Sequence, residues 1–500
     1  MRYTTTLLPL SLAALAAADP IHIPLTRRSV RRDGIERFAA AADHVRAKYG
    51  YPTVSSNLRR RAKTAGIDII NQDADSSYIG TVTIGTPSQS FPVVLDTGSS
   101  DLWLATTSCT SCPDQTPEFN PSSSSTLVQN NTSGQNSEIE IQYGSGAVKG
   151  TLASDTVSMA GFTVDSQTLL LVSDVTSGLL GGNVSGILGL AFEALASTQA
   201  TPFWEALVND KQMSSPEISF WLTRFIDDAD ATPEEPGGVF TLGGTNSTLY
   251  TGSIEFQSLV DSSSPTFWML DVSSVTVQGK SVSIPTGSSA QAAIDTGTTL
   301  IGGPSEAVKN VYAAIPGSQA LSGQYNGFYA FPCSTTVNVS MAFGGSSWPI
   351  SPEDMNLGPM QEGSNYCVGG IFDLDLGSDV SSGNGNPSWV VGDTFLKNVY
   401  SVFRASPAAV GFAQLSEAAG GSSGTPSGSV GSATLTGTNV PTSSTSSTSS
   451  TPSASGTSTT TASSTSSHSS ASRVANTGAV SLGIILSIAA STLSGWFVLA

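Results

Sequence analysis

The chain has 500 residues, enough for more than one domain, and a formal net charge of −18. Only 12% of the residues are charged, and this acidic balance disfavours a nucleic-acid-binding protein, which needs a basic surface. With three histidines and four cysteines, the sequence offers no His/Cys cluster typical of a zinc centre, and we expect no metal.

The N-terminal region reads as a signal peptide followed by a basic leader. Residues 1–18 hold Arg2, an apolar run and small residues, which favours a secretory signal over a buried helix. Residues 19–63 contain 11 Lys and Arg against 4 acids, whereas 8 basic and 34 acidic residues follow. Such a leader could bind nucleic acid or an anionic membrane, but in a secreted chain we expect a pro-segment that covers the acidic body, with a processing site at Arg59–Arg61 and Lys63.

Most of the body between residues 67 and 414 has a β pattern. Residues 78–85 alternate with period two, 86–89 predict a turn, and 91–95 return as an apolar strand that ends at Asp96. Helical patterns are best at 203–209 and 306–315. The sequence therefore predicts an all-β fold.

Two stretches read almost alike, Val94–Ser100 and Ala293–Thr299. Each places an Asp (Asp96 and Asp295) after apolar residues and before Thr-Gly and a hydroxyl. Asp-Thr-Gly is also a common turn, so neither stretch means much alone. Together they predict two similar halves whose carboxyls share a proton at one site. One carboxylate could then activate a water while the other carboxyl protonates a substrate carbonyl.

The four cysteines predict two local disulfides, Cys109–Cys112 and Cys333–Cys367, as expected in a secreted chain. A redox-active Cys-x-x-Cys is the alternative for the first pair. Sequons for N-glycosylation begin at Asn130 or Asn131, Asn183, Asn246 and Asn338. Asn183 adjoins an apolar glycine strand, which could make it inaccessible.

The C-terminal region predicts a surface anchor. Residues 418–476 are rich in Ser and Thr and read as a glycosylated stalk. Residues 477–500 are mostly apolar and follow Asn476, which favours a GPI-attachment signal with Asn476 as the attachment residue. Attachment at 469–472 and a transmembrane helix are the alternatives. We expect a cell-surface protein bound to the plasma membrane.

Several motifs occur in a fixed order between residues 78 and 415: Ile84–Pro87, Phe91–Trp103, Tyr143–Gly146, Gly186–Leu190, Ala293–Leu300, Trp389–Leu396 and Val410–Ala413. Together they resemble the pepsin-type aspartic proteases, and in particular the fungal GPI-anchored cell-surface members. The resemblance implies two β lobes, 64–255 and 256–417, with an active cleft between them. It also implies a monomeric endopeptidase that acts on peptides and needs no cofactor. The aspartic-protease dyad is the established example of two carboxyls that share a proton.

The resemblance also implies residue roles. Asp96 and Asp295 would hold the catalytic water, and their neighbours would support them. The supporting residues are Thr97 and Thr296 as cross-braces, Ser99 and Thr298 as donors to the outer carboxylate oxygens, and Gly98 and Gly297 for close approach. Tyr143, Gly144 and Ser145 would form a mobile flap, with Trp103 bonded to the tyrosine; an ordinary surface hairpin is the alternative. Gly186–Leu190 and Val390–Gly392 would support the active loops, and Asp393 would make structural hydrogen bonds.

In related zymogens a Lys-Tyr pair blocks the site, and we expect Lys48 and Tyr49 to do so here; Lys48 as a solvated cation is the alternative. Substrate specificity stays open. Ser145 stands where Lys-cleaving relatives have Asp, which favours hydrophobic residues, whereas the acidic insert at 227–235 could favour basic ones. A catalytically silent wall protein is the rival interpretation, and a serine or metallo hydrolase lacks its motifs.

Overall fold

The computed structural model describes residues 21–28, 35–54, 75, 77–129, 138–143, 146–177, 179–180, 183–228, 234–377, 385–422 and 424, with the backbone alone for 21–28 and 234. All of them belong to one compact unit, residues 1–436, and residues 437–500 form a second unit. The predicted signal peptide, processing site, flap tip (Gly144 and Ser145), sequons at Asn130 and Asn131, and anchor at Asn476 lie outside the described residues. No helix among the described residues has the length and apolarity needed to span a membrane.

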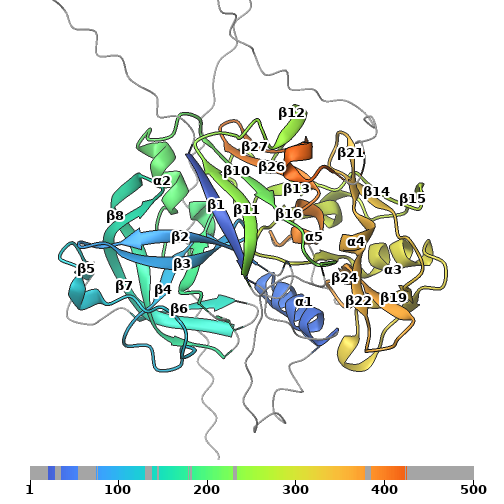
Figure 1. Ribbon diagram of the computed structural model, residues 1–500, viewed down its shortest axis with the longest axis horizontal. Coiled ribbons are helices and arrows are strands. Elements are labelled where there is room, and N and C mark those ends of the chain that lie inside the picture. Colours follow the sequence, from blue (N-terminus) through green and yellow to red (C-terminus); the bar gives the residue numbers. More distant parts are fainter. Residues whose placement is uncertain are drawn as a thin grey trace, which may run out of the picture. The chain divides into compact units, whose positions relative to one another are not determined.

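Fourteen of the described strands form one large sheet that runs through the molecule (Figure 1). In spatial order they are β12 (Tyr250–Ser258), β27 (Ala408–Leu415), β26 (Val399–Ala405), β10 (Glu217–Leu222), β11 (Glu234–Leu242), β1 (Ile21–Arg28), β2 (Tyr78–Ile84), β3 (Gln89–Asp96), β9 (Gly186–Gly189), β4 (Leu102–Ala105), β8 (Phe162–Val175), β7 (Gly146–Met159) and β5 (Val128–Gln129), while β6 (Glu138–Tyr143) pairs with β7. The expected lobe boundary after residue 255 falls inside β12.

Three smaller sheets build the second lobe. They are, again in spatial order, β13 (Met269–Asp271), β16 (Gln291–Ile294), β25 (Trp389–Val391), β17 (Ile301–Gly303) and β24 (Ile371–Asp373); β15 (Lys280–Val282), β14 (Ser274–Val277), β20 (Val339–Ala342) and β21 (Ser347–Ile350); and β18 (Gln319–Ala320), β19 (Tyr329–Pro332), β23 (Tyr366–Gly369) and β22 (Asn356–Pro359).

Helices are few and short, and the predicted all-β, two-lobed fold is confirmed. The α-helices are α1 (Glu36–Lys48), α2 (Phe203–Asn209), α3 (Ser305–Ala313), α4 (Pro352–Met355) and α5 (Asp393–Leu396). The described 3-10 turns are η2 (Pro121–Ser123), η4 (Glu193–Leu195), η5 (Gly287–Ala290), η6 (Gly323–Tyr325) and η8 (Glu417–Ala419). α2 has the bounds predicted from the sequence, and α3 begins one residue earlier and ends two residues earlier than expected.

The two halves repeat one strand arrangement around each Asp-Thr-Gly loop. In the first half β3 enters the loop and runs parallel to β9, while β4 leaves it antiparallel to β9. In the second half β16 enters and runs parallel to β25, while β17 leaves antiparallel to β25. β9 and β25 are the glycine strands that the sequence predicted to support the active loops. A side chain at Gly392 would place Cβ 2.0 Å from the Thr298 carbonyl oxygen, so this approach needs glycine.

An aromatic cluster joins the two halves behind the loops. The ring centroids of Phe192 and Trp268 lie 4.4 Å apart, and those of Trp204 and Trp268 lie 5.4 Å apart. Trp268 also donates from Nε1 to the Leu190 carbonyl oxygen at 2.9 Å. The buried rings fix the position of one half against the other, because aromatic pairs combine large buried area with a preferred geometry.

The leader contributes two elements to this unit. β1 pairs antiparallel with β11 and with β2, and in Figure 1 it lies as a dark-blue strand between them. α1 follows and buries Phe38, Ala42, Val45 and Tyr49 against the second lobe. Their spacing of four, three and four residues defines one helical face, and the Ala-rich sequence favours a helix. Sequence reasoning missed this helix although both signals were present.

Candidate active site

Asp96 and Asp295 meet where the two lobes touch. Asp96 is the last residue of β3, and Asp295 directly follows β16. Their residue exposures are 3% and 0%. In each loop the amide of the glycine two residues on donates to the carboxylate: Gly98 to Asp96 Oδ1 and Gly297 to Asp295 Oδ1, both at 2.9 Å. Each backbone turn therefore holds its own carboxylate in place.

Thr97 and Thr296 bind the two loops to each other across the lobes. The Thr97 amide donates to Thr296 Oγ1 at 3.1 Å, and the Thr296 amide donates to Thr97 Oγ1 at 2.9 Å. Each hydroxyl in turn donates to the opposite strand: Thr97 to the Ile294 carbonyl at 2.9 Å and Thr296 to the Leu95 carbonyl at 2.7 Å. Four hydrogen bonds between buried groups therefore set the separation of the two loops.

A hydroxyl three residues after each Asp also binds its carboxylate. Ser99 Oγ donates to Asp96 Oδ2 and Thr298 Oγ1 donates to Asp295 Oδ2, both at 2.6 Å. The loops then approach so closely that a Cβ at Gly98 would lie 2.5 Å from Asp295 Cγ, and one at Gly297 would lie 2.3 Å from Asp96 Oδ1. Only glycine fits at these two positions without displacing the carboxylates.

The leader reaches both carboxylates. Lys48, the last residue of α1, places Nζ 2.8 Å from Asp96 Oδ1 and 2.8 Å from Asp295 Oδ2. The Tyr49 hydroxyl donates to the same Asp295 oxygen at 2.8 Å. Asp295 Oδ2 thus accepts hydrogen bonds from Lys48, Tyr49 and Thr298. The Ser99 hydroxyl donates to Asp96 Oδ2, the oxygen that Lys48 does not contact. The Lys48 side chain is 6% exposed, so it is not a solvated cation here.

The two carboxyls differ in acidity. Burial opposes the charge of Asp295, but the Lys48 ammonium and the Thr298 hydroxyl hold its pKa well below the ordinary value. For Asp96, burial together with the negative charge of Asp295 outweighs the lowering by Lys48 and raises the pKa. Burial lowers the pKa of Lys48 itself, yet the two carboxylates raise it overall. The docked leader therefore keeps Asp295 ionised beside a charged ammonium.

Tyr143 is the last residue of β6, next to the hairpin tip, and is buried. Its hydroxyl accepts a hydrogen bond from Trp103 Nε1 at 2.7 Å, and the two rings lie 6.2 Å apart. The predicted partners are thus in contact, which disfavours an exposed tyrosine on an ordinary hairpin.

One expectation about a neighbouring carboxyl was wrong. Asp393, at the start of α5, is fully buried, but neither carboxyl oxygen has a hydrogen-bond partner, so it does not make the predicted structural hydrogen bonds. Burial raises its pKa well above the ordinary value, and the nearby negative charge of Asp295 adds to the rise. A protonated carboxyl carries no charge and needs no cation, although the positive charge of Lys397 partly opposes the rise in pKa.

Sequence reasoning also missed a buried charge network behind the site. Lys397 places Nζ 2.8 Å from Asp75 Oδ2 and 2.6 Å from Asp354 Oδ1, and its side chain is 2% exposed. Arg224 donates to the other oxygen of Asp354 at 2.7 Å, and Asn398 donates to it at 2.8 Å. These residues lie far apart in the sequence, so no local motif marks them.

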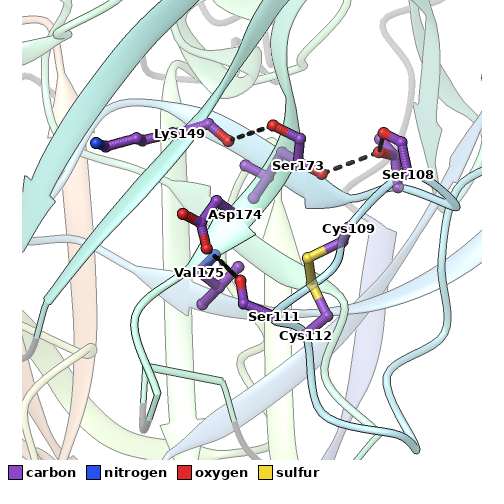
Figure 2. Close-up of a disulfide and its surroundings, with 10 residues drawn as sticks. Ser108, Cys109, Ser111, Cys112, Lys149, Ser173, Asp174 and Val175 are labelled. Atoms are coloured by element: carbon purple, nitrogen blue, oxygen red, sulfur yellow. Dashed lines mark hydrogen bonds between the residues drawn. A yellow bond between two sulfur atoms is a disulfide. The ribbon is translucent and has the colours of Figure 1, made fainter.

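Both predicted disulfides are present, Cys109–Cys112 and Cys333–Cys367. Figure 2 shows the first beside the end of β8, where Ser111 accepts a hydrogen bond from the Val175 amide at 2.7 Å and donates to Asp174. This anchoring makes the small Cys-x-x-Cys loop part of the first lobe.

Three predicted sequons fall among the described residues. Asn183 is exposed although it lies three residues before the buried strand β9, so the expected inaccessibility was wrong. Asn338 is also exposed, and Asn246 is half-buried.

Comparison with known proteins defines the class to which this fold and site belong. The sequence model of the family described as "Eukaryotic aspartyl protease" matches residues 77–415. A protein named Major aspartyl peptidase 1 of Cryptococcus neoformans var. grubii is 39% identical over 459 residues, which cover 85% of this chain and 91% of that protein. An Aspartic protease of Phaffia rhodozyma is 35% identical over 74% of this chain and 84% of its own. Human Cathepsin D is 30% identical over 82% of this chain and 98% of its own.

The site is that of a pepsin-type hydrolase with one aspartate from each lobe. The chain belongs to the eukaryotic aspartyl protease family, and its activity is that of an aspartic endopeptidase acting on peptides.

Proposed function

We propose that this chain is the zymogen of a secreted acid endopeptidase that is held at the cell surface by a GPI anchor. The proposal that the chain is a zymogen rests on the contact of Lys48 Nζ with both Asp96 and Asp295 at 2.8 Å. While α1 is docked, the ammonium holds the place between the carboxylates where a peptide bond would have to enter. Removal of residues 19–63, with cleavage near Arg59–Arg61, would open the site.

Acid supports this release. Asp295 owes its low pKa mainly to Lys48, so protonation of the carboxyls removes the attraction that holds the leader. The very acidic body repels itself less as it is protonated, which suits work at low pH.

In the open enzyme, Asp96 Oδ1 and Asp295 Oδ2 would face a shared water. One carboxylate takes a proton from the water as its oxygen attacks the peptide carbonyl carbon, and the other carboxyl gives its proton to the carbonyl oxygen. As the resulting diol collapses, one of its hydroxyls gives its proton to the ionised carboxylate, the C–N bond breaks, and the amine nitrogen takes the proton of the protonated carboxyl, which restores a dyad with one proton. The bonds from Ser99, Thr298 and the two glycine amides support this role because they fix both carboxylates beforehand.

Secretion, the stalk and the anchor rest on the sequence of residues 1–18, 418–476 and 477–500. The two disulfides support passage through an oxidising compartment. Release of the protein by a GPI-specific phospholipase, lost on Asn476→Gln, would test the anchor and its residue together. A transmembrane helix would instead leave the protein in the membrane after that treatment.

The rival function is a silent wall protein on a protease scaffold. The deciding experiment is proteolysis of a denatured protein by the leader-free enzyme from about pH 3 to about pH 7, with and without pepstatin, beside Asp96→Asn. We expect acid activity that both pepstatin and the substitution abolish. Folded, leader-free protein without activity at any pH would overturn the enzyme and favour the wall protein.

A further inference from the structure

Arg46 of the leader occupies a site of its own, two residues before Lys48. Its side chain is 1% exposed. Nε and Nη2 donate to the Asp373 carbonyl oxygen at 3.1 and 2.6 Å, and Cζ lies 5.0 Å from the centroid of the Phe372 ring. We call the residues around this guanidinium, Gly327, Phe372, Asp373 and Asp375, the Arg46 socket.

The socket fits a guanidinium closely. A Cβ on Gly327 would lie 2.3 Å from Arg46 Nη2, and the φ of +91° at this residue also favours glycine. Two donors converge on one carbonyl oxygen while the plane of the group faces an aromatic ring. An arginine side chain can make both contacts at once, whereas the single ammonium of a lysine cannot.

Burial lowers the pKa of Arg46, and carboxyls near the socket oppose this effect. Arg46 has its direct ion pair with Asp43 of the same leader helix, at 2.9 Å. Beyond that, the carboxyls of Asp373 and Asp375 attract the guanidinium from the body when they are ionised, and the Ser305 hydroxyl lies within hydrogen-bond distance of both. Burial, together with the negative charge of Asp375, raises the pKa of Asp373 to about 6, so Asp373 attracts a cation mainly above that pH. Release of the leader removes Arg46 and Asp43 together, whereas the carbonyl, the ring and the two carboxyls stay behind.

The socket also lies close to the catalytic carboxyls, both through the sheet that carries Asp295 and through the leader helix. Phe372 and Asp373 are in β24, which pairs with β17, and β17 follows directly from the loop of Asp295. On the leader side, one helix carries both Arg46 to the socket and Lys48 to the carboxylates. A peptide that replaces the leader at the dyad can therefore extend a side chain toward the socket.

We propose that, in the mature enzyme, the Arg46 socket is a substrate subsite that binds the guanidinium of an arginine near the bond to be cleaved. The leader then blocks the enzyme at two points, with Lys48 at the dyad and Arg46 in the specificity site. This assignment rests on the proposed function, because it requires an active enzyme from which the leader has been removed.

The test compares peptides that differ at one position, scanned through four residues on each side of the cleaved bond. Each position carries arginine, citrulline, lysine or norleucine, and kcat/KM is measured for the leader-free enzyme. Citrulline keeps the planar shape without the charge, and lysine keeps the charge without the planar fork. We expect one position where arginine exceeds citrulline about tenfold and also exceeds lysine.

Two substitutions then locate the preference. Phe372→Leu removes the aromatic face and Asp375→Asn removes a carboxylate, and each should bring the arginine-to-citrulline ratio toward one. The norleucine peptide reports folding and catalysis in each variant. Asp210→Asn, an exposed carboxylate at the end of α2 in the first lobe, is the matched charge control and should keep the wild-type ratio.

Absence of an arginine preference at every position, with norleucine peptides still cleaved, would overturn the socket as a subsite. A preference that persists in both Phe372→Leu and Asp375→Asn would also overturn it and would point to the acidic residues Asp227 and Asp228 instead. Failure to cleave any peptide would refute the proposed function itself, and this inference with it.

Discussion

His44 lies one helical turn before Lys48 on α1, so its imidazole shares a helix face with the ammonium that binds both catalytic carboxyls. Burial, together with the positive charge of Lys48, lowers the pKa of His44 to about 4, against the opposing effect of Asp295. In the released leader, the pKa of His44 would return to its ordinary value of about 6.5.

This relationship predicts a pH dependence of leader release. The pKa of His44 is lower in the docked leader than in the released leader. The docked state is therefore destabilised as the pH falls from about 6.5 to about 4, with no further loss below that. The shift corresponds to about 3 kcal/mol. His44→Gln should therefore move the midpoint of leader release about one unit toward acid, measured by the appearance of activity against pH. His468→Gln, in the predicted stalk, should leave the midpoint unchanged, and equal midpoints for wild type and His44→Gln would contradict the prediction.

Thr97→Val should destabilise the contact between the lobes. The buried hydroxyl donates to the Ile294 carbonyl and accepts from the Thr296 amide, and valine leaves both without a partner. We expect a loss of about 2–4 kcal/mol, seen as a lower melting temperature in calorimetry. Thr97→Ser keeps the hydroxyl and serves as the control. A melting temperature for the valine variant equal to that of the serine variant would show that the bridge adds nothing.

Tyr143→Phe should impair both catalysis and stability. The change removes the acceptor of the buried Trp103 indole N–H, which would lose its 2.7 Å bond. We expect kcat/KM to fall about tenfold and the stability to fall by about 1–3 kcal/mol, seen as a lower melting temperature. Trp103→Phe should have a similar effect, and the double substitution should cost little more than either alone. Fully additive losses would mean that the two side chains act independently.

Lys397→Met should strongly destabilise the protein. It removes a cation that pairs with the buried carboxylates of both Asp75 and Asp354. Breaking such a buried pair costs about 3–5 kcal/mol, which should appear as a large drop in melting temperature or in folded yield. Lys149→Met is the matched control, because Lys149 is half-exposed and pairs with Glu140 at 3.2 Å on the surface. Similar melting temperatures for the two variants would refute the role of the network.

Much of the site could be predicted from the sequence because its chemistry is local. An Asp followed by Thr-Gly and a hydroxyl contains both the acid and the groups that hold it, and the structure places Gly98, Ser99, Gly297 and Thr298 on their own carboxylates. The bounds of α2 followed from a local apolar pattern in the same way. The helix α1 was predictable from its Ala-rich apolar face but was overlooked.

Contacts between distant segments could not be predicted in this way. Lys397 and Asp75 are 322 residues apart, and Arg46 and Asp373 are 327 apart, so no spacing rule relates them. The misjudged hydrogen bonds of Asp393 belong to the same class, since only the packing around a carboxyl decides whether it is ionised and paired or protonated and alone.

The sequence by itself determined the reacting groups, the residues that support them and the presence of two similar halves. These features depend on neighbouring residues and on the alternating pattern of single strands. Tertiary structure alone decided that Arg46 fills a socket near the two carboxyls and that buried charges pair behind them, whereas the contact of Lys48 with the carboxyls was expected from the resemblance to related zymogens. These depend on which surfaces fold together, and burial in a low-dielectric interior then sets the strength and pKa of each interaction.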